Sequence, residues 1–364
     1  MSSSVSSPSA PAPAQPSQHG SEARPRREHR YDIDLIRLLC SVGVIVCHTG
    51  SAFVKAAGRE ASNAPGTYWA GLVGDSAGRF AVPLFFAIAG WVVLVGAPVR
   101  DGRQLWQRIV RIVVPLGVWT ALYLAWGKLR GTNADPLRDL ALDAVFASVR
   151  PAYHLWYLYA YIPVIMLLAF VSLVKAGKRP WGLGAALLVL GAAPSLFGDV
   201  SKVAGIELPH FGWGFGPYQL IYAALGALLL SMPAGTLGRF RLWWLLPAGG
   251  ALAAIVWYQH DVHYAIPYAS VLVALFSVAV LLSLLRAGVP ERLRPALARL
   301  SGASFGAYMV HVLVLGVLTD AMIDTDLGLP AAAALAVAVT AATAAVSFGA
   351  ALLWTRLGLT RLLG

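Results

Sequence analysis

The segment DLIRLLCSVGVIVCH, residues 34–48, decides the class of fold, because it places an acid, an arginine and a histidine inside an apolar run. The run extends over residues 33–53, and a helix needs about 20 such residues to cross a bilayer. The whole chain has this character: 58% of its 364 residues are hydrophobic and 12% are charged, whereas a soluble domain carries about 25% charged residues. We therefore expect an all-α integral membrane protein and exclude both a soluble enzyme and a disordered chain.

Ten apolar runs follow one another along the chain, so we predict about ten transmembrane helices. The fifth and sixth runs are short and interrupted by glycine or proline, and no internal repeat is visible. The predicted spans are residues 33–53, 76–96, 109–127, 154–174, 181–197, 217–232, 242–259, 266–285, 303–319 and 330–354.

The first 28 residues differ from the rest of the chain, because they are rich in Ser, Pro and Ala and contain no apolar run. Such a composition cannot bury enough apolar surface to fold. We predict two parts: a disordered cytoplasmic tail over residues 1–28 and a ten-helix transmembrane domain over residues 29–364.

The basic residues predict the orientation of the chain in the membrane. With the N-terminus placed in the cytoplasm, 19 of the 28 Lys and Arg residues fall in inside segments and 8 in outside segments. Positive charge is enriched on the cytoplasmic side of membrane proteins, so we expect both termini inside. This distribution also explains the net charge of +11 without a nucleic-acid partner.

Asp34, Arg37 and His48 are predicted to share one face of the first helix. Arg37 and His48 are eleven residues apart, which is about three turns plus 20° and about 16 Å along the axis. Asp34 precedes Arg37 by three residues, so an ion pair is feasible. Ionisable residues inside spans are costly and usually functional. The alternatives are that Asp34 and Arg37 reach the inner headgroups and that His48 is a neutral, packed histidine.

Polar residues in later spans are candidates for binding a substrate. Arg79 opens the second predicted span from the outside, and His154 and Trp156 open the fourth in HLWYL. An interfacial aromatic belt explains His154 nearly as well as a functional role. His311 lies mid-span in SFGAYMVH, where a polar ring needs a partner, so a structural hydrogen bond and a substrate role are both open.

Arg108 and Arg111 enter the third predicted span from the cytoplasm on one helical face, in RIVRIVVP. Ordinary positive-inside charge is one interpretation, and a phosphate clamp is the other. Cys40 and Cys47 lie seven residues apart; on one helix that is about 10 Å, too far for a disulfide. We expect both to be small core residues.

These residues together resemble the membrane acyltransferase-3 family, over about residues 30–355. The strongest element is an arginine and a histidine separated by ten residues in the first span. Arg37 and His48 match it, and Asp34 is the acid three residues before the arginine. VPLFFAIAGW at residues 82–91 is similar to the second-span signature, although Ala89 stands where a serine is usual. Arg108 and Arg111 match the Arg-x-x-Arg pair, and HLWYL and SFGAYMVH match two later signatures.

The resemblance implies an O-acyltransferase in the bacterial inner membrane. It implies an acyl-CoA donor, usually acetyl-CoA, on the cytoplasmic side, and as acceptor a cell-envelope polysaccharide or lipid-linked glycan. Membrane lipids and other envelope-biosynthesis proteins are the further partners expected. No metal is expected.

The residues suggest a division of roles for such a reaction. His48 is the best general base, because imidazole titrates near neutrality, although it can instead carry the acyl group covalently. Arg37 is expected to steer the donor, with Asp34 holding its guanidinium. Arg108 and Arg111 are expected to bind the CoA phosphates. Arg79, His154, Trp156 and His311 are expected to bind the acceptor or orient His48.

Two other classes of protein remain as alternatives at this stage. A sugar or lipid transporter, or a flippase, also places charges inside spans, although the missing repeat counts mildly against it. A non-catalytic scaffold of an envelope-synthesis complex has no need for the stripe formed by Arg37 and His48.

Overall fold

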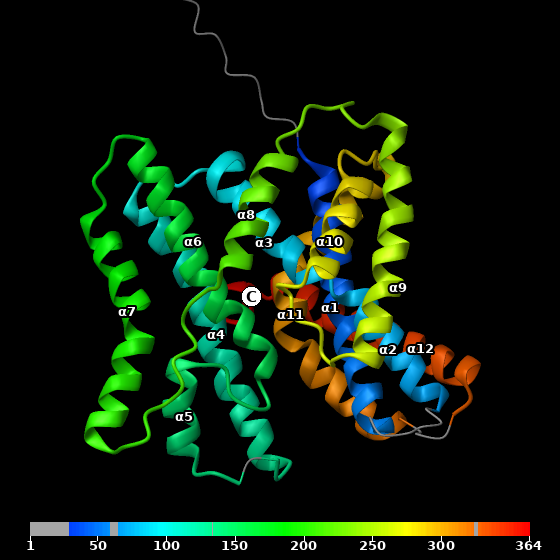
Figure 1. The fold of residues 1–364 in the computed structure, drawn as a ribbon, viewed down its shortest axis with the longest axis horizontal. Coiled ribbons are helices and arrows are strands. Elements are labelled where there is room, and N and C mark those ends of the chain that lie inside the picture. The colour runs from blue at the N-terminus through cyan, green and yellow to red at the C-terminus, as the bar shows by residue number, and fades with distance from the viewer. Residues whose placement is uncertain (1–28, 59–64, 133, 324–326) are drawn as a thin grey trace, which may run out of the picture. The chain divides into compact units, whose positions relative to one another are not determined.

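The computed structural model describes residues 29–58, 65–132, 134–323 and 327–364. The predicted disordered tail, residues 1–28, lies outside the described residues. Within the described ranges the secondary structure is helical and contains no strand (Figure 1). The helices are α1 (Tyr31–Ala57), α2 (Gly66–Gly78), α3 (Ala81–Trp91), η1 (Val92–Gly96), α4 (Gly102–Leu129), α5 (Leu137–Phe146), η2 (Tyr153–Leu155), α6 (Trp156–Lys175), α7 (Trp181–Ala204), α8 (Pro217–Leu229), η3 (Gly238–Trp244), α9 (Leu245–Asp261), α10 (Val271–Leu284), η4 (Glu291–Leu293), α11 (Arg294–Met322), α12 (Leu329–Arg356) and α13 (Thr360–Leu363).

Each of the ten predicted spans coincides with a helix or a run of consecutive helices. Among the described residues, eight of these runs are long and apolar enough to cross a membrane. The other two, α8 and α10, have 13 and 14 residues, which is shorter than the hydrocarbon core requires. The all-α membrane class is confirmed and the chain is a multi-pass membrane protein, while the count of ten crossings stays a prediction.

The second apolar run is broken in its middle, between α2 and α3. Arg79 and Phe80 form a turn there, and Pro83 follows in the first turn of α3. A proline has no N–H to donate and its ring clashes with the carbonyl four residues earlier, which here belongs to Arg79. The predicted start of this span at residue 76 is wrong, because the helical run already begins at Gly66. Arg79 therefore lies in the middle of the run, not at its outer end.

Helices α1 and α2 approach each other closely through glycine. A Cβ atom at Gly50 would lie 2.1 Å from the backbone nitrogen of Asp75, and one at Gly78 would lie 2.3 Å from the carbonyl oxygen of Gly43. Small residues allow such backbone contact between membrane helices, where packing rather than water exclusion drives association. This contact fixes the position of His48 on α1 relative to Asp75 on α2.

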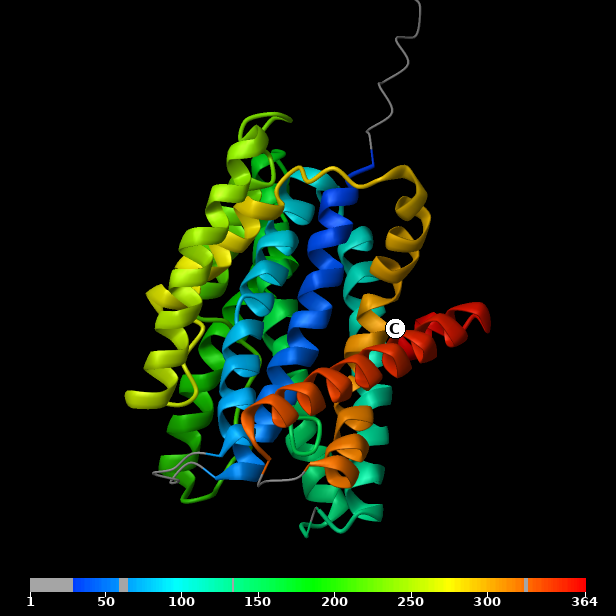
Figure 2. The same cartoon turned by 90° about the vertical axis from the view of Figure 1, so that its right-hand side faces the viewer.

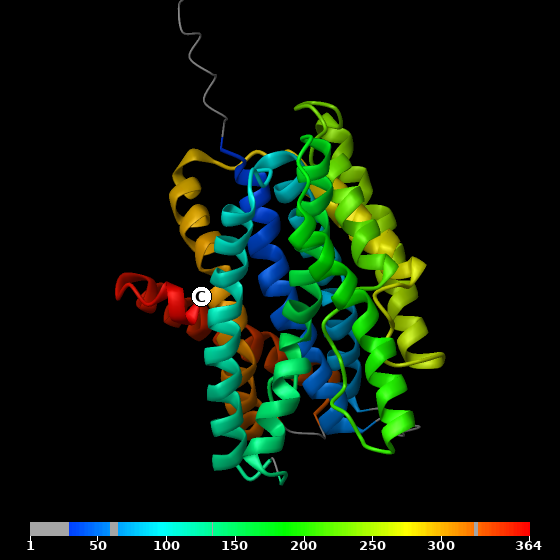
Figure 3. The ribbon, with the colours of Figure 1, turned by 90° about the vertical axis from the view of Figure 1, so that its left-hand side faces the viewer.

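The outer helices differ in direction and exposure. Helix α12 packs against α11, α2 and α1, and Figure 2 shows that it crosses them obliquely instead of running along them. Helix α7 lies on the face seen in Figure 3, and 6% of its most apolar stretch is buried, as expected for a helix surrounded by lipid. The runs α1 and α2–α3, with 61% and 67% buried, form the centre.

Candidate active site

A cavity of about 320 Å³ lies between α1, α3, α6 and α11. Its lining is mostly apolar and aromatic, with Phe85 and Tyr157 among the walls. Arg37 and His48 both line it, as the eleven-residue spacing predicts for two side chains on one helical face. A concave, mostly apolar space with a few polar groups is typical of a small-molecule site.

Three histidines from three separate segments meet beside this cavity. His48 of α1 has its ring centre 5.3 Å from that of His311 of α11 and 6.5 Å from that of His154 of η2. The rings of His154 and His311 are 5.1 Å apart. His48 and His154 line the cavity, and His311, which is 0% exposed, lies behind them.

The rings of His311 and His48 each have a hydrogen-bond partner at Nδ1. Nδ1 of His311 lies 2.6 Å from the carbonyl oxygen of Tyr308, and because a carbonyl only accepts, Nδ1 must carry the hydrogen. Nε2 of His311 therefore has the lone pair; it is buried, and no partner for it is found among the described residues. Nδ1 of His48 lies 3.3 Å from the hydroxyl of Tyr153.

His154 is held by aromatic rings and by its own backbone. Its ring packs edge-on against Tyr123 and Tyr308, and the Tyr308 hydroxyl donates to the His154 carbonyl at 2.5 Å. His154 is 1% exposed, so it does not belong to an exposed interfacial belt. Among the described residues no group of His, Cys, Asp or Glu is arranged to hold a metal ion.

Arg37 is tied to α11 as well as to its own helix. One guanidinium nitrogen lies 3.1 Å from the Ser301 hydroxyl and 3.5 Å from the Asp34 carboxylate. Ser301 also donates to Asp34 at 2.8 Å. Asp34 thus binds Ser301 inside the bundle instead of reaching the headgroups, and the three groups anchor the guanidinium at one end of the cavity.

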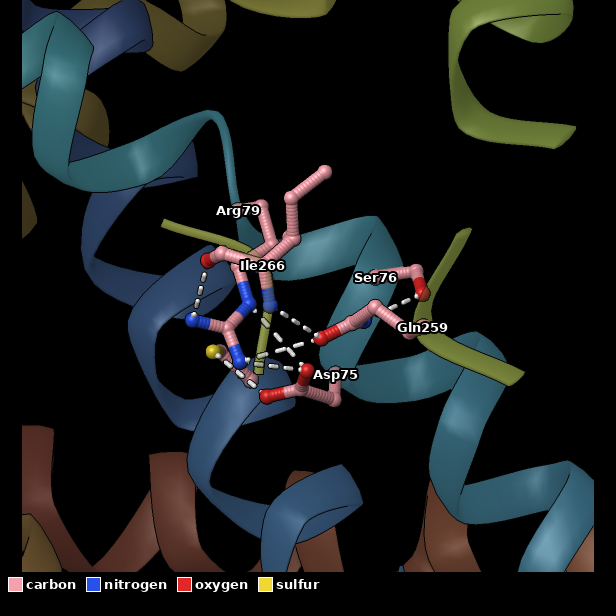
Figure 4. A network of polar contacts seen from close by, with 6 residues as sticks. Asp75, Ser76, Arg79, Gln259 and Ile266 are labelled. Carbon is pink, nitrogen blue, oxygen red and sulfur yellow. Dashed lines mark hydrogen bonds and ion pairs between the residues drawn. The ribbon is translucent and has the colours of Figure 1, made fainter. Parts of the chain in front are cut away.

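Arg79 belongs to a buried polar network behind the cavity (Figure 4). It forms an ion pair with Asp75, with nitrogen–oxygen distances of 2.6 and 3.1 Å, and also reaches Gln259 at 3.4 Å. Gln259 donates to the Ser76 hydroxyl at 2.8 Å, which joins α9 to α2. Arg79 is not among the residues that line the cavity, but its guanidinium lies 5.7 Å from the ring centre of Tyr268, which does line it.

Cys47 links this network to the histidine cluster. Its thiol donates to Asp75 at 3.2 Å, and Cys47 directly precedes His48 on α1. Both Cys40 and Cys47 are buried and free, as expected for residues that cannot form a disulfide with each other. Asp75 thereby binds both the thiol of Cys47, the residue before His48, and the guanidinium of Arg79.

The structure does not bring Arg108 and Arg111 to the cavity. Arg108 donates to the carbonyl of Ala97 at 2.5 Å, and Arg111 is exposed on α4. Their neighbour Ile112 lines the cavity, whereas the two arginines do not. The pair therefore lies outside the site that contains Arg37 and His48.

Sequence reasoning missed several groups of this site. Asp75 was left outside the second predicted span, although an acid four residues before Arg79 is a recognisable helical ion pair. Tyr153 directly precedes HLWYL, and Tyr308 lies within SFGAYMVH, where it counts as one more aromatic residue of an apolar run. Ser301 precedes the ninth predicted span and carries no hydropathy signal.

The comparisons with known proteins identify the family. The family model described as an acyltransferase domain, acyltransferase 3, matches residues 30–352, which is nearly the whole chain. No match was found among curated proteins or among solved structures. With a family match of this extent over a helical membrane fold, the chain belongs to the acyltransferase 3 family.

Proposed function

We propose that this membrane acyltransferase is an acyl-CoA-dependent O-acyltransferase. It moves an acetyl group from cytoplasmic acetyl-CoA to a hydroxyl of a cell-envelope polysaccharide or lipid-linked glycan, across the bacterial inner membrane. Membership of the family supports acyl transfer in general. The observation that carries the finer proposal is that Arg37 and His48 line one cavity, about 16 Å apart along α1.

The long, narrow shape of an acyl-CoA suits this spacing. The CoA phosphates stay at the cytoplasmic end of the bundle, where the arginines of α4 lie, and the pantetheine arm passes Arg37. The thioester then reaches the histidine cluster, about two thirds of the way along α1. An acceptor that arrives from the outer side meets it there, so no charged group has to cross the hydrocarbon core.

His48 is the proposed base of the reaction. The acceptor oxygen attacks the thioester carbon, the carbon–sulfur bond breaks, and the proton of the acceptor passes to His48 and from there to the departing CoA thiolate. The same positions allow a two-step route in which His48 first takes the acetyl group as an acyl-imidazole. The ring centre of His311 lies 5.3 Å from that of His48, and its Nε2 has no partner among the described residues, so we propose that it orients His48.

Acetyl transfer by the purified protein tests the proposed function. We expect that protein in nanodiscs, given acetyl-CoA labelled in the acetyl group and envelope glycan, releases CoA and labels the glycan. Counting label in the washed glycan measures the reaction. If no label reaches the glycan in nanodiscs, and the protein in closed liposomes moves glycan across the bilayer, the proposal is overturned in favour of the transporter.

The arginine pair on α4 gives a separate prediction about the donor. We expect the double variant Arg108→Ala, Arg111→Ala to bind CoA about 10- to 100-fold more weakly, because charge-assisted contacts to phosphate are lost. Calorimetric titration with CoA measures the change. The double variant Arg356→Ala, Arg361→Ala, which removes two exposed arginines at the end of the chain, is the matched control. Unchanged affinity in the α4 variant would assign the pair to membrane orientation alone.

A further inference from the structure

A second pocket, of about 410 Å³, adjoins the cavity. The segment of residues 205–216 forms one side of it, on its way from the end of α7 to the start of α8 (Figure 1). The first turns of α6 and α8 form most of the rest, together with Ala147 and Ser148 after α5 and Pro194 of α7. This pocket has no role in the reaction described above.

The aromatic walls of this pocket are fixed by hydrogen bonds to α5. The indole nitrogen of Trp213 donates to the Val145 carbonyl at 2.7 Å, and the Tyr159 hydroxyl donates to the Ala144 carbonyl at 2.5 Å. The two rings pack with their centres 4.5 Å apart. Gly212 lets the segment approach α5, because a Cβ atom there would lie 2.9 Å from Ala147. The rings are therefore pre-arranged before any ligand binds.

Trp156 joins the pocket to the cavity. It lines both spaces, and it stands two residues after His154, whose ring belongs to the histidine cluster. Its ring stacks on Tyr268, with the ring centres 5.9 Å apart and the planes at 29°. A molecule that fills the pocket therefore lies one side chain away from the space in which His48 is exposed.

The chemistry of the lining selects the class of ligand. The aromatic residues Trp213 and Tyr218 line it, with Tyr159 packed behind Trp213, and His210 and Gln219 add polar groups. Aromatic faces are electron-rich and pack against the weakly positive C–H faces of sugar rings. No Lys or Arg is among the described residues that line the pocket, which argues against CoA phosphates. The volume lies within the range of about 300–1,000 Å³ of small-ligand sites.

We propose that this pocket binds a neutral hexopyranose unit of the acceptor glycan. The proposal rests on the proposed function for the identity of the acceptor. In this proposal the segment of residues 205–216 recognises the acceptor. Trp156 separates the pocket for the acceptor from the cavity for the donor. A sugar ring held on Trp213 and Tyr218 extends its neighbouring unit past Trp156 toward His48.

Direct binding of simple sugars tests the pocket. The probes are the methyl glycosides of glucose, galactose, mannose and N-acetylglucosamine, each measured by saturation-transfer NMR with the full-length purified protein. We expect at least one to bind the wild type and to bind Tyr218→Ala about tenfold more weakly, because one stacking face is lost. The control Trp243→Ala removes an aromatic ring that is 66% exposed and outside the pocket, and it is expected to bind like the wild type.

Two outcomes would overturn the proposal: no glycoside binds the wild type, or Tyr218→Ala binds as the wild type does. Should Tyr218→Ala fail to fold, His210→Ala replaces it, since His210 is exposed at the rim.

A kinetic measurement separates this inference from the proposed function. With labelled acetyl-CoA and envelope glycan, we expect Tyr218→Ala to raise the KM for glycan about tenfold and to leave the KM for acetyl-CoA unchanged. A wild type that transfers acetyl, with an unchanged glycan KM in the variant, would refute the pocket and leave the function standing. A wild type that transfers no acetyl but binds glycosides through Tyr218 would refute the function and leave the pocket standing.

Discussion

Replacing His48 by alanine is expected to lower acetyl transfer by about 100- to 10,000-fold, the usual contribution of a positioned base. The loss arises because His48 is the histidine that α1 contributes to the cavity wall, and alanine cannot accept a proton in its place. His154 also lines the cavity, but it lies on η2, and both of its ring nitrogens are buried. Initial rates with labelled acetyl-CoA measure the change.

The matched control for this variant is His263→Ala, which removes an exposed histidine of the loop after α9. It is expected to keep the wild-type rate, and both variants are expected to elute from size exclusion as the wild type does. Turnover by His48→Ala within a few-fold of the wild type would remove His48 from the mechanism. Acid-quenched wild type, digested and weighed by mass spectrometry, separates the two routes, since an acetylated His48 peptide appears only in the acyl-imidazole route.

Removing the Asp75 carboxylate is expected to be the most destabilising of the substitutions considered. Asp75→Ala leaves the Arg79 guanidinium buried and without its ion partner, a change that costs about 3–5 kcal/mol in buried pairs. It also removes the acceptor of the Cys47 thiol. Thermal unfolding in detergent, followed by loss of the monodisperse peak, measures the effect.

The exposed pair formed by Arg130 and Asp320 provides the control, with 41% and 59% of the two side chains exposed. Asp320→Ala is expected to cost about 0–1 kcal/mol, because water screens such pairs. The double variant Asp75→Leu, Arg79→Met is expected to recover part of the lost stability, since no charge is left buried. Equal losses from Asp75→Ala and Asp320→Ala would show that the buried network contributes little.

Much of the fold follows from the sequence, because hydropathy and helical periodicity are local properties. The ten apolar runs locate the helices, and the spacing of Arg37 and His48 places both on one face before any tertiary contact is known. Hydropathy gives the length of an apolar segment but not the tilt of the helix that it forms. It therefore predicts α12 as one more span and does not predict its oblique path. The start of the second run was missed because Asp75 and the glycines around it lower its hydropathy.

The candidate site depends more on contacts between distant segments. That His154 and His311 both meet His48 is not contained in any local pattern, since they lie on η2 and α11. Arg79 lies in the middle of the run because the run begins at Gly66, and Pro83, which was visible in the sequence, accounts only for the turn between α2 and α3. The distance of Arg108 and Arg111 from the cavity was not visible, because helical periodicity gives the face of a residue but not the neighbour that this face meets.

The glycine contact between α1 and α2 has a consequence for how substrates enter and leave. Two helices whose backbones touch have no intervening layer of side chains that can slide or repack, so we expect α1 and α2 to move together. On that expectation, the exchange of donor and product depends on the bulky rings that α6 and α11 contribute to the cavity, such as Tyr157 and Tyr308.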